Sequence, residues 1–360
     1  MTQTVATVTP TVYRVPTPTP EGDGTLTWDA TTVVTCLLEA GGRTGLGWTY
    51  SSPAAAVIIT EHLAPVLIDH DLGDIAGCYA RMRRACRNLG TKGLVMQAIS
   101  AVDIALWDLL GRTLGVPVNA LLGGGGSVRV YGSGGFTTFD DRQLAVQVEA
   151  WSTAGCTAMK IKIGESWGTA EDRDLARVAR FAELAGPGVQ LMVDANGGYG
   201  AGQARRIGEQ LDRAGVVWFE EPVSSDDPTG LGLVRAALRC DVAAGEYLSE
   251  PQQAAALCLV VDCLQLDATR CGGYTGWLAC ARVAAAAQVP VSAHCAPALH
   301  AALAGTVEHL RHLEWFADHA RLEPILFDGV PRVLAGTLTP FERPGHGMSV
   351  SGRAAEYRVG

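Results

Sequence analysis

Three short segments decide the fold: Leu191–Asn196 (LMVDAN), Val217–Pro222 (VWFEEP) and Ala243–Leu248 (AAGEYL). In each segment an apolar, strand-like run ends at an acid, and the acids stand at positions 194, 220 and 246, each 26 residues from the next. Such a step is long enough for one strand and one helix with their loops. The equal steps predict three consecutive β/α units, with the acids at the carboxyl ends of neighbouring parallel strands.

The same alternation continues on both sides of these segments. Short apolar runs are followed by polar turns and then by amphipathic stretches rich in Ala, Leu and Arg. Helix-start signals stand between the runs, including Glu171 with Asp172, Pro251 and Thr275. Eight runs predict a closed β/α barrel; they span residues 128–131, 158–163, 190–193, 216–219, 242–244, 263–266, 290–293 and 312–315.

The residues before and after the barrel show other patterns. Residues 13–50 predict a β-meander with turns at 21–24 and 41–43, and residues 54–122 have helical periodicity. We therefore expect an N-terminal α+β capping domain over residues 1–123 and the barrel over residues 124–326. The remainder, 327–360, is too short to fold alone, so we expect it to pack back on the capping domain.

Composition narrows the class of protein. The 360 residues include 28 basic and 37 acidic ones, for a net charge of −9, without a Lys/Arg block, which argues against nucleic acid as a partner. We expect no leader peptide at the start, and no run near the roughly 18 apolar residues of a membrane span. Ten cysteines without a C-x-x-C pair indicate reduced thiols. A cytoplasmic protein is therefore expected.

The three acids suggest a metal site. Asp194, Glu220 and Glu246 would repel one another strongly at one barrel mouth unless a cation lay between them. Oxygen-only ligands favour Mg²⁺, with Mn²⁺ second, over zinc. The alternative is that each acid caps the following helix, which is the commoner role of a single such residue. Three acids at equal spacings of 26 residues would rarely arise from three unrelated helix caps.

Other strand ends carry candidate acid–base residues. Lys160 and Lys162 alternate with apolar residues, so both amines project to one side of their strand, where each should lower the pKa of the other. A solvated strand face is the alternative, and K-x-K alone would favour it. Asp267 and His294 end neighbouring strands, so the carboxylate can hold one ring nitrogen and raise the basicity of the other. Glu314 ends the last predicted strand.

Together these residues resemble the mandelate racemase subgroup of the enolase superfamily. The resemblance covers nearly the whole chain and includes the helix Ala98–Gly123 (AISAVDIALWDLLGRTLGVPVNALLG). It implies a modified TIM barrel, (β/α)₇β, under an α+β capping domain, with Mg²⁺ on the three acids. It also implies removal of the proton α to a carboxylate through an enediolate, with Glu314, if protonated or shared, donating a hydrogen bond. The implied catalytic residues are Lys160, Lys162, Asp267, His294 and Glu314.

The same site serves two reactions, because Lys162 and His294 would face opposite sides of the α-carbon. Reprotonation from the second face gives a racemase or epimerase of a 2-hydroxy acid. Loss of a β-hydroxyl gives dehydration of an acid sugar, an aldonate or an aldarate, which the resemblance favours. A non-catalytic binding protein is the third hypothesis, since fold alone does not prove function; the filled catalytic positions argue against it.

Specificity is expected from the capping domain, whose loops, residues 16–28 and 47–53, should close over the mouth. The candidate substrate-binding residues there are Asp23, Trp28 and Tyr50, joined by Asn196 and Arg270 of the barrel. Arg270 fits a substrate contact and a rim ion pair equally well. Apart from Arg14, the first loop has no basic cluster, which favours a monoacid over a diacid. The substrate, its stereochemistry and the size of the expected homo-oligomer stay open.

Overall fold

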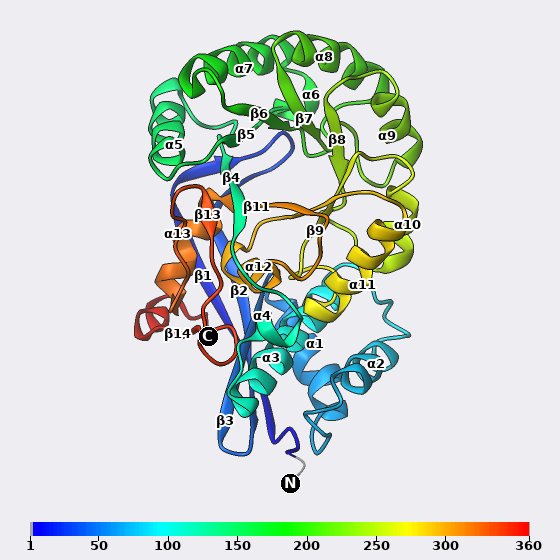
Figure 1. The fold of residues 1–360 in the computed structure, drawn as a ribbon, viewed down its shortest axis with the longest axis vertical. Coiled ribbons are helices and arrows are strands. Elements are labelled where there is room, and N and C mark those ends of the chain that lie inside the picture. Colours follow the sequence, from blue (N-terminus) through cyan, green and yellow to red (C-terminus); the bar gives the residue numbers. More distant parts are fainter. Residues whose placement is uncertain (1–2, 360) are drawn as a thin grey trace.

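The computed structural model describes residues 3–359. Its centre is a closed barrel of eight parallel strands, each paired with the next along the chain, and β11 closes the ring on β4 (Figure 1). Each predicted run coincides with one strand, so the predicted barrel is confirmed. The strands are β4 (Val128–Gly134), β5 (Ala158–Lys162), β6 (Gln190–Asp194), β7 (Val216–Glu220), β8 (Asp241–Ala244), β9 (Cys263–Leu266), β10 (Val291–Ala293) and β11 (Leu310–Phe316).

Helices alternate with these strands and cover the outside of the barrel (Figure 1). Local signals set where they begin: Asp140 and Gln143 form a capping box at α5, and Pro251 takes the first position of α10. The helix expected from Thr275 begins two residues earlier, at Gly273. The helices are α5 (Asp141–Thr153), α6 (Glu165–Gly168), α7 (Glu171–Ala185), α8 (Ala201–Arg213), α9 (Pro228–Arg235), α10 (Pro251–Leu257), α11 (Gly273–Ala286), α12 (Pro297–His300) and α13 (Ala317–Leu326).

The N-terminal residues form an antiparallel sheet covered by helices, as predicted. Its strands are β1 (Thr7–Gly22), β2 (Thr27–Ala40) and β3 (Arg43–Tyr50). Gly47 lets the long helix α3 lie close to β3, because a Cβ at this position would stand 2.1 Å from the Ala101 carbonyl oxygen. The helical elements are α1 (Ala54–Ile58), η1 (Ile59–Leu63), η2 (Ala64–Val66), α2 (Ile75–Ala85), α3 (Leu94–Leu114) and α4 (Val118–Leu121).

The two expected lid loops are mostly strand. β1 and β2 leave only residues 23–26 as a hairpin tip, and β3 continues to Tyr50, so the prediction of long loops at 16–28 and 47–53 is wrong. The tip is docked on the barrel: the Trp167 backbone N–H donates to the Gly24 carbonyl oxygen at 2.9 Å. A Cβ on Gly24 would lie 2.6 Å from the Ile163 carbonyl oxygen, so the fit requires glycine.

Helix α3 is the most apolar element of the capping domain. It has 21 residues and a mean hydropathy of 1.5 over its most apolar window, enough for a membrane span by length and composition. Our expectation that no run would reach this level is wrong for α3. Within the fold, however, 78% of that window is buried, where α3 packs against β2, β3 and α11. Its hydropathy is thus that of a core helix.

The C-terminal segment connects the barrel to the capping domain. β13 (Thr337–Leu338) pairs with β4, and β12 (Phe327–Asp328) pairs with β14 (Ser349–Val350). Beyond η4 (Gly352–Tyr357), the Val359 N–H donates to the Val12 carbonyl oxygen of β1 at 2.9 Å, and the C-terminus lies beside β1 in Figure 1. The last thirty or so residues therefore contact both the barrel and the capping sheet.

Candidate active site

Three acids converge inside the barrel. Asp194 and Glu220 are the last residues of β6 and β7, and Glu246 stands two residues after β8. One carboxylate oxygen from each lies within 4.8 Å of the other two, and all three side chains are buried. The parallel strands end at one edge, which is why residues 26 positions apart meet here.

Both lysines of β5 point into this cluster. The Lys160 ammonium contacts Glu220 and lies 2.9 Å from Glu314 Oε1 and 3.8 Å from Asp194 Oδ2. Lys162 donates a hydrogen bond to Asp194. The two amines are on the same side of the strand, but neither is on a solvated face, since both residues are buried.

The pKa of Lys162 depends on all the charges around its amine. Burial lowers the pKa of Lys162, and the nearby Lys160 charge lowers it further, but Asp194, Glu246 and Glu220 together raise it above its ordinary value. The three carboxylates together outweigh burial and the charge of Lys160. A neutral Lys162 therefore requires additional positive charge among the acids.

The acids are short of positive partners. Glu246 Oε2 is buried without a hydrogen-bond donor in residues 3–359. Burial raises the pKa of Glu220 well above its usual range; Lys160 opposes this, and Asp194 and Glu314 add to it. Three carboxylates with no nitrogen or sulfur ligand are the donor set that a hard divalent cation prefers. The residues present therefore fit Mg²⁺.

A histidine–carboxylate pair lies on the next two strands. His294 Nδ1 is 2.9 Å from Asp267 Oδ2, so Nδ1 is the nitrogen that donates to the carboxylate. Burial raises the pKa of Asp267, but the hydrogen bond from His294 and the charge of Arg270 lower it more, and the carboxylate stays ionised. The other ring nitrogen, Nε2, faces Glu246 Oε2 at 3.3 Å.

Glu314 lies within β11 rather than at its end, and it accepts hydrogen bonds. Its oxygens accept from Ser133 Oγ at 2.6 Å and from the Cys295 N–H at 2.7 Å, beside the Lys160 ammonium. Burial raises the pKa of Glu314, but the charges of Lys160 and His294 lower it well below its usual range. Glu314 is therefore an acceptor here, and donation by a protonated or shared Glu314 stays a prediction.

Two sequence profiles match this arrangement. Residues 4–123 match the N-terminal domain of mandelate racemase and muconate lactonizing enzyme, and residues 143–355 match the enolase C-terminal domain-like family. The chain belongs to the mandelate racemase/muconate lactonizing enzyme family. This confirms the family and the superfamily that the motifs predicted.

Three relatives illustrate the range of the family. The L-talarate/galactarate dehydratase of Salmonella typhimurium is 32% identical over 326 residues, which are 88% of this chain and 79% of that protein. A mandelate racemase/muconate lactonizing enzyme-like protein from Rubrobacter xylanophilus is 42% identical, with a TM-score of 0.96 over 99% of this chain and all of that one. A Streptomyces coelicolor racemase with bound magnesium is 28% identical, with a TM-score of 0.92 over 99% and 100%.

Two predicted substrate contacts, Asp23 and Tyr50, are hydrogen-bonded within the fold. Asp23 Oδ1 accepts the N–H groups of Thr25 and Leu26, which closes the hairpin tip. The Tyr50 hydroxyl donates to Glu323 Oε1 at 2.9 Å, and its ring stacks on His319 with centroids 3.4 Å apart. These contacts help to hold the capping domain in place, and substrate binding by both residues stays a prediction.

The other three candidates lie closer to the site. Arg270 pairs with Glu246 Oε1 at 3.3 Å and with Asp267 Oδ2 at 3.5 Å, so of its two expected roles the ion pair is the one seen. Asn196 donates its backbone N–H to Asp194, and its side-chain Oδ1 is buried without a donor in the described chain. Trp28 packs edge-to-face on an aromatic cluster beside the barrel mouth.

Sequence reasoning missed Cys295. Its Sγ lies 3.3 Å from His294 Nε2, and its backbone has a positive φ of 52°. Burial and the charge of Glu314 raise the pKa of this thiol, so it stays neutral. The one signal available was its position directly after His294.

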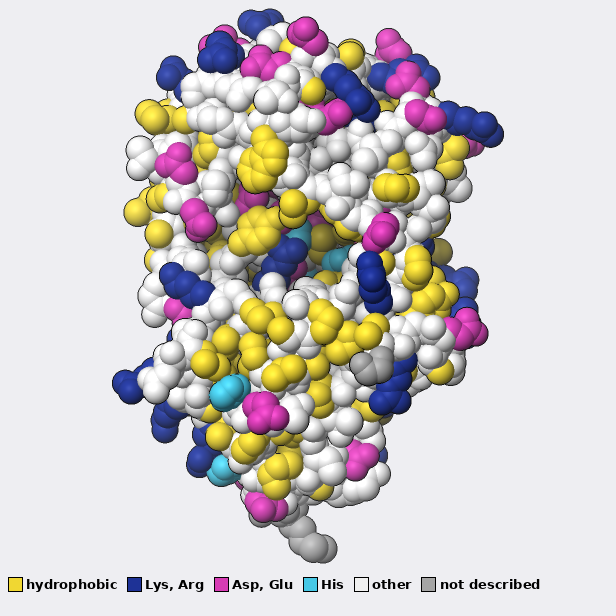
Figure 2. Space-filling view, turned by 180° about the vertical axis from the view of Figure 1, so that it is seen from behind, with side chains coloured by type: hydrophobic (Ala, Val, Ile, Leu, Met, Phe, Trp, Pro, Cys, Tyr) yellow, Lys and Arg dark blue, Asp and Glu magenta, His cyan; other side chains and the backbone are white. Residues whose placement is uncertain are grey.

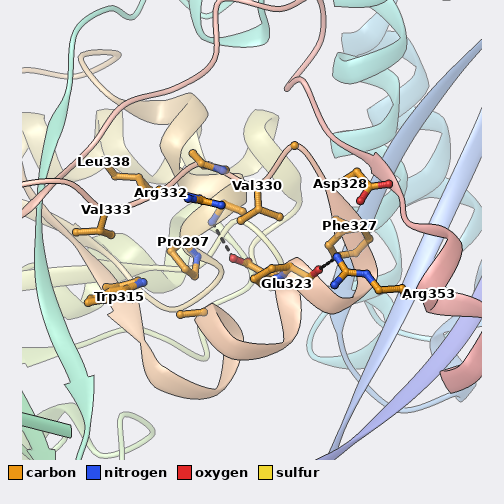
Figure 3. Close-up of a pocket in the computed structure, with 15 residues that line it drawn as sticks. Pro297, Trp315, Glu323, Phe327, Asp328, Val330, Arg332, Val333, Leu338 and Arg353 are labelled. Atoms are coloured by element: carbon orange, nitrogen blue, oxygen red, sulfur yellow. Dashed lines mark hydrogen bonds between the residues drawn. The ribbon is translucent and has the colours of Figure 1, made fainter. Parts of the chain in front are cut away.

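Two hollows have to be distinguished. Figure 2 shows a hollow near the middle of one face, in which Lys or Arg, acidic and His side chains are visible. A separate cavity of about 480 Å³ lies between α13 and the C-terminal segment, and Figure 3 shows Glu323 near its centre. None of the catalytic or metal candidates lines that cavity, so the chemistry belongs to the barrel interior.

Proposed function

We propose that the protein is a Mg²⁺-dependent dehydratase of an acid sugar. The observation that carries this proposal is the placement of two acid–base groups about the acids: Lys162 contacts Asp194 on one side, and His294 approaches Glu246 on the other. Substrate carbon atoms between them can lose a proton to one group and receive one from the other.

Asp194, Glu220 and Glu246 would hold the metal ion. Their oxygen-only set and the unpartnered Glu246 Oε2 support this assignment. When bound, Mg²⁺ supplies a positive charge that stabilises the carboxylate of the substrate as its α-carbon loses a proton.

The protein side chains then divide the proton transfers. Lys162 Nζ takes the α-proton, while Lys160, held by Glu220 and Glu314, stays protonated. In its doubly protonated form, His294 gives the proton on Nε2 to the departing β-hydroxyl, whose C–O bond breaks as water forms. Asp267 keeps the proton on Nδ1 and so keeps the ring oriented. The enol product tautomerises to a 2-keto-3-deoxy acid.

A racemase or epimerase of a 2-hydroxy acid is the second candidate. The same two groups on opposite sides favour it, because reprotonation from the second side inverts the α-carbon. It is also supported by the similarity to the Streptomyces coelicolor racemase. The two functions differ in one measurable step, the loss of water.

We also propose that the enzyme works in the cytoplasm on a small carboxylate and assembles as a homo-oligomer. The cysteines support a reducing compartment, since all ten are buried and unpaired. The burial of α3 inside the fold removes its hydropathy as an argument for a membrane. The oligomer rests on the family resemblance, and sedimentation analysis tests it.

The test is a screen of aldonates and aldarates with Mg²⁺ in D₂O. We expect at least one acid to exchange its α-proton and to yield a 2-keto-3-deoxy acid. Exchange with inversion and without loss of water would select the racemase. If no acid exchanged its α-proton, both candidates would be wrong.

A further inference from the structure

His294 and Cys295 are neighbours in the sequence whose polar atoms meet in space. Successive side chains of an extended chain point to opposite sides. Here β10 ends at Ala293, and Cys295 and Ala296 have positive φ angles of 52° and 40°. Neither residue is a glycine, so the backbone makes an uncommon turn at this point. With this turn the Cys295 sulfur lies 3.3 Å from His294 Nε2.

Glu314 of β11 adds an oxygen to this pair. Its Oε2 lies 3.8 Å from His294 Nε2, and the ligand atoms of His294, Cys295 and Glu314 all lie within 4.8 Å of one another. Three atoms at such separations leave a point between them that is about 2 to 2.5 Å from each, close to the lengths of Zn–N, Zn–O and Zn–S bonds. A metal ion at this point would touch all three.

Each of the three atoms can offer a lone pair to a cation. His294 Nδ1 donates to Asp267, so in the neutral ring the lone pair is on Nε2. A carboxylate behind a histidine ligand is a usual feature of metal sites. Glu314 Oε2 accepts the Cys295 N–H at 2.7 Å and keeps a second lone pair. The Cys295 thiol loses its proton to solvent when a bond from sulfur to the metal forms.

The donor set differs from that of the three acids in β6, β7 and the loop after β8. Nitrogen and sulfur ligands favour Zn²⁺, whereas Mg²⁺ takes oxygen ligands. A thiolate and the Glu314 carboxylate together match the double charge of Zn²⁺. Lys160 contacts the other oxygen of Glu314 and is also paired with Glu220. His294 and Cys295 are 3% and 5% exposed, so both ligands keep contact with solvent.

We propose that His294, Cys295 and Glu314 form a second metal site, which binds Zn²⁺ and inhibits the enzyme. Zn²⁺ on His294 Nε2 occupies the atom that exchanges a proton with the substrate. The inhibition rests on the proposed function, but the binding of Zn²⁺ does not. Mg²⁺ at the three acids and Zn²⁺ at this second site would have opposite effects on turnover.

Co²⁺ serves as the probe, because it takes the tetrahedral ligands of Zn²⁺ and a Co²⁺–thiolate bond absorbs strongly in the near ultraviolet. The protein is saturated with Mg²⁺, and Co²⁺ is then titrated in. We expect the thiolate absorption to appear in the wild type and to disappear when Zn²⁺ is added. Co²⁺ at the three acids gives no such absorption, since those ligands contain no sulfur.

Cys295→Ser and Cys295→Ala should lack this absorption, with thermal melts to establish that both are folded. Cys156→Ser is the matched control and should keep it, because Cys156 is also 5% exposed but precedes β5, at the opposite end of the barrel. No absorption in the wild type would overturn the proposal and leave the thiol as a hydrogen-bond donor to His294. Absorption that persisted in both Cys295 variants would overturn it too, since another thiol would then bind Co²⁺.

Inhibition is measured as Zn²⁺ titrations of α-proton exchange at saturating Mg²⁺, with each variant compared with its own rate without Zn²⁺. Groups that only orient a ligand contribute about 10- to 100-fold to metal affinity, so loss of the ligand itself in Cys295→Ser should raise the half-inhibiting Zn²⁺ concentration by at least about 10-fold. Cys156→Ser should match the wild type. Equal inhibition of all variants would assign inhibition to the three acids and refute the inhibitory role. If no acid exchanged its α-proton, the proposed function would fail, and the Co²⁺ absorption would still decide the metal site.

Discussion

Two buried carboxylates of this protein have opposite surroundings. Asp108 of α3 lies where the capping domain meets the C-terminal segment, and Glu246 lies in the barrel mouth; both are almost inaccessible to water. Asp108 accepts hydrogen bonds from the Leu46 N–H, the His346 N–H and the Arg112 guanidinium, each at 2.8 Å. Glu246 Oε2 accepts none from the described residues.

The difference separates a structural acid from a functional one. Asp108 has donors on both oxygens, so its charge is compensated within the protein and it fixes three chain segments together. The barrel acids are compensated only in part, which leaves them a capacity for a cation. Burial alone does not distinguish the two kinds of acid; the count of donors does.

Removal of the metal is expected to have the largest effect. Because Asp194, Glu220 and Glu246 need a cation, EDTA should lower turnover by more than about 1000-fold, and added Mg²⁺ should restore it. The melting temperature should fall with EDTA and rise with Mg²⁺, since a ligand of the folded state stabilises it. Full activity in a preparation shown to be metal-free would contradict the assignment of the acids.

Loss of either acid–base residue should be nearly as severe but differ in kind. His294→Asn should still exchange the substrate α-proton with D₂O while forming product at least about 100-fold more slowly than wild type. Lys162→Ala should neither exchange the proton nor form product. The two patterns exchange places if the substrate has the opposite configuration. In a racemase each variant would exchange only one enantiomer. Full turnover in both variants would exclude the two-base assignment.

Paired substitutions sharpen the comparison of the two acids. Asp108→Asn leaves buried donors without an acceptor and should lower the free energy of unfolding by about 1–3 kcal/mol, with Mg²⁺ affinity unchanged. Glu220→Gln should weaken Mg²⁺ binding in calorimetry without that loss of stability. Unchanged Mg²⁺ affinity in Glu220→Gln would assign metal binding to the neighbouring Glu221 instead. An Asp108→Asn variant as stable as wild type would contradict the structural role of Asp108.

The smallest expected effect is on the pH dependence of stability. It comes from a third buried acid, Glu323, which accepts a hydrogen bond from the Tyr50 hydroxyl. Burial raises its pKa from 4.5 to about 8, so the folded state holds a proton that the unfolded state releases. Its stabilisation is complete below pH 4.5 and is lost as the pH rises to about 8, by at most about 1.4 kcal/mol per unit.

Glu323→Gln should therefore lose less stability than wild type between pH 5 and 8. Urea titrations at several pH values measure the difference. Glu21, whose pKa is also raised to about 8, adds its own slope to both proteins, so Glu21→Gln is the matched control. Equal pH slopes in wild type and Glu323→Gln would show that Glu323 is ionised in the fold.

The sequence was most informative where chain periodicity determines geometry. Parallel strands of a barrel end at one edge, so Asp194, Glu220 and the residue two positions beyond β8 had to meet. The same rule placed Lys162 beside them. The structure brings together the three acids, the two lysines, Asp267, His294 and Glu314.

It was least informative where partners come from remote segments. The Tyr50 hydroxyl is used by Glu323, 273 residues away, and no local pattern shows such a bond. The pattern around Lys160 and Lys162 likewise shows two ammoniums but not the number of carboxylates around them.

The bond between Val359 and β1 has a consequence for the order of folding during synthesis. The first strand of the capping sheet leaves the ribosome more than 300 residues before Val359, which pairs with it. Asp108 likewise gains its hydrogen bond from the His346 N–H only after residue 346 has been made. At the usual rate of synthesis, about 5–20 residues per second, the capping domain stays incomplete for tens of seconds while the barrel emerges. In that interval α3 can already pack on β2 and β3, whereas its contact with α11 forms only after residues 273–286 have been made.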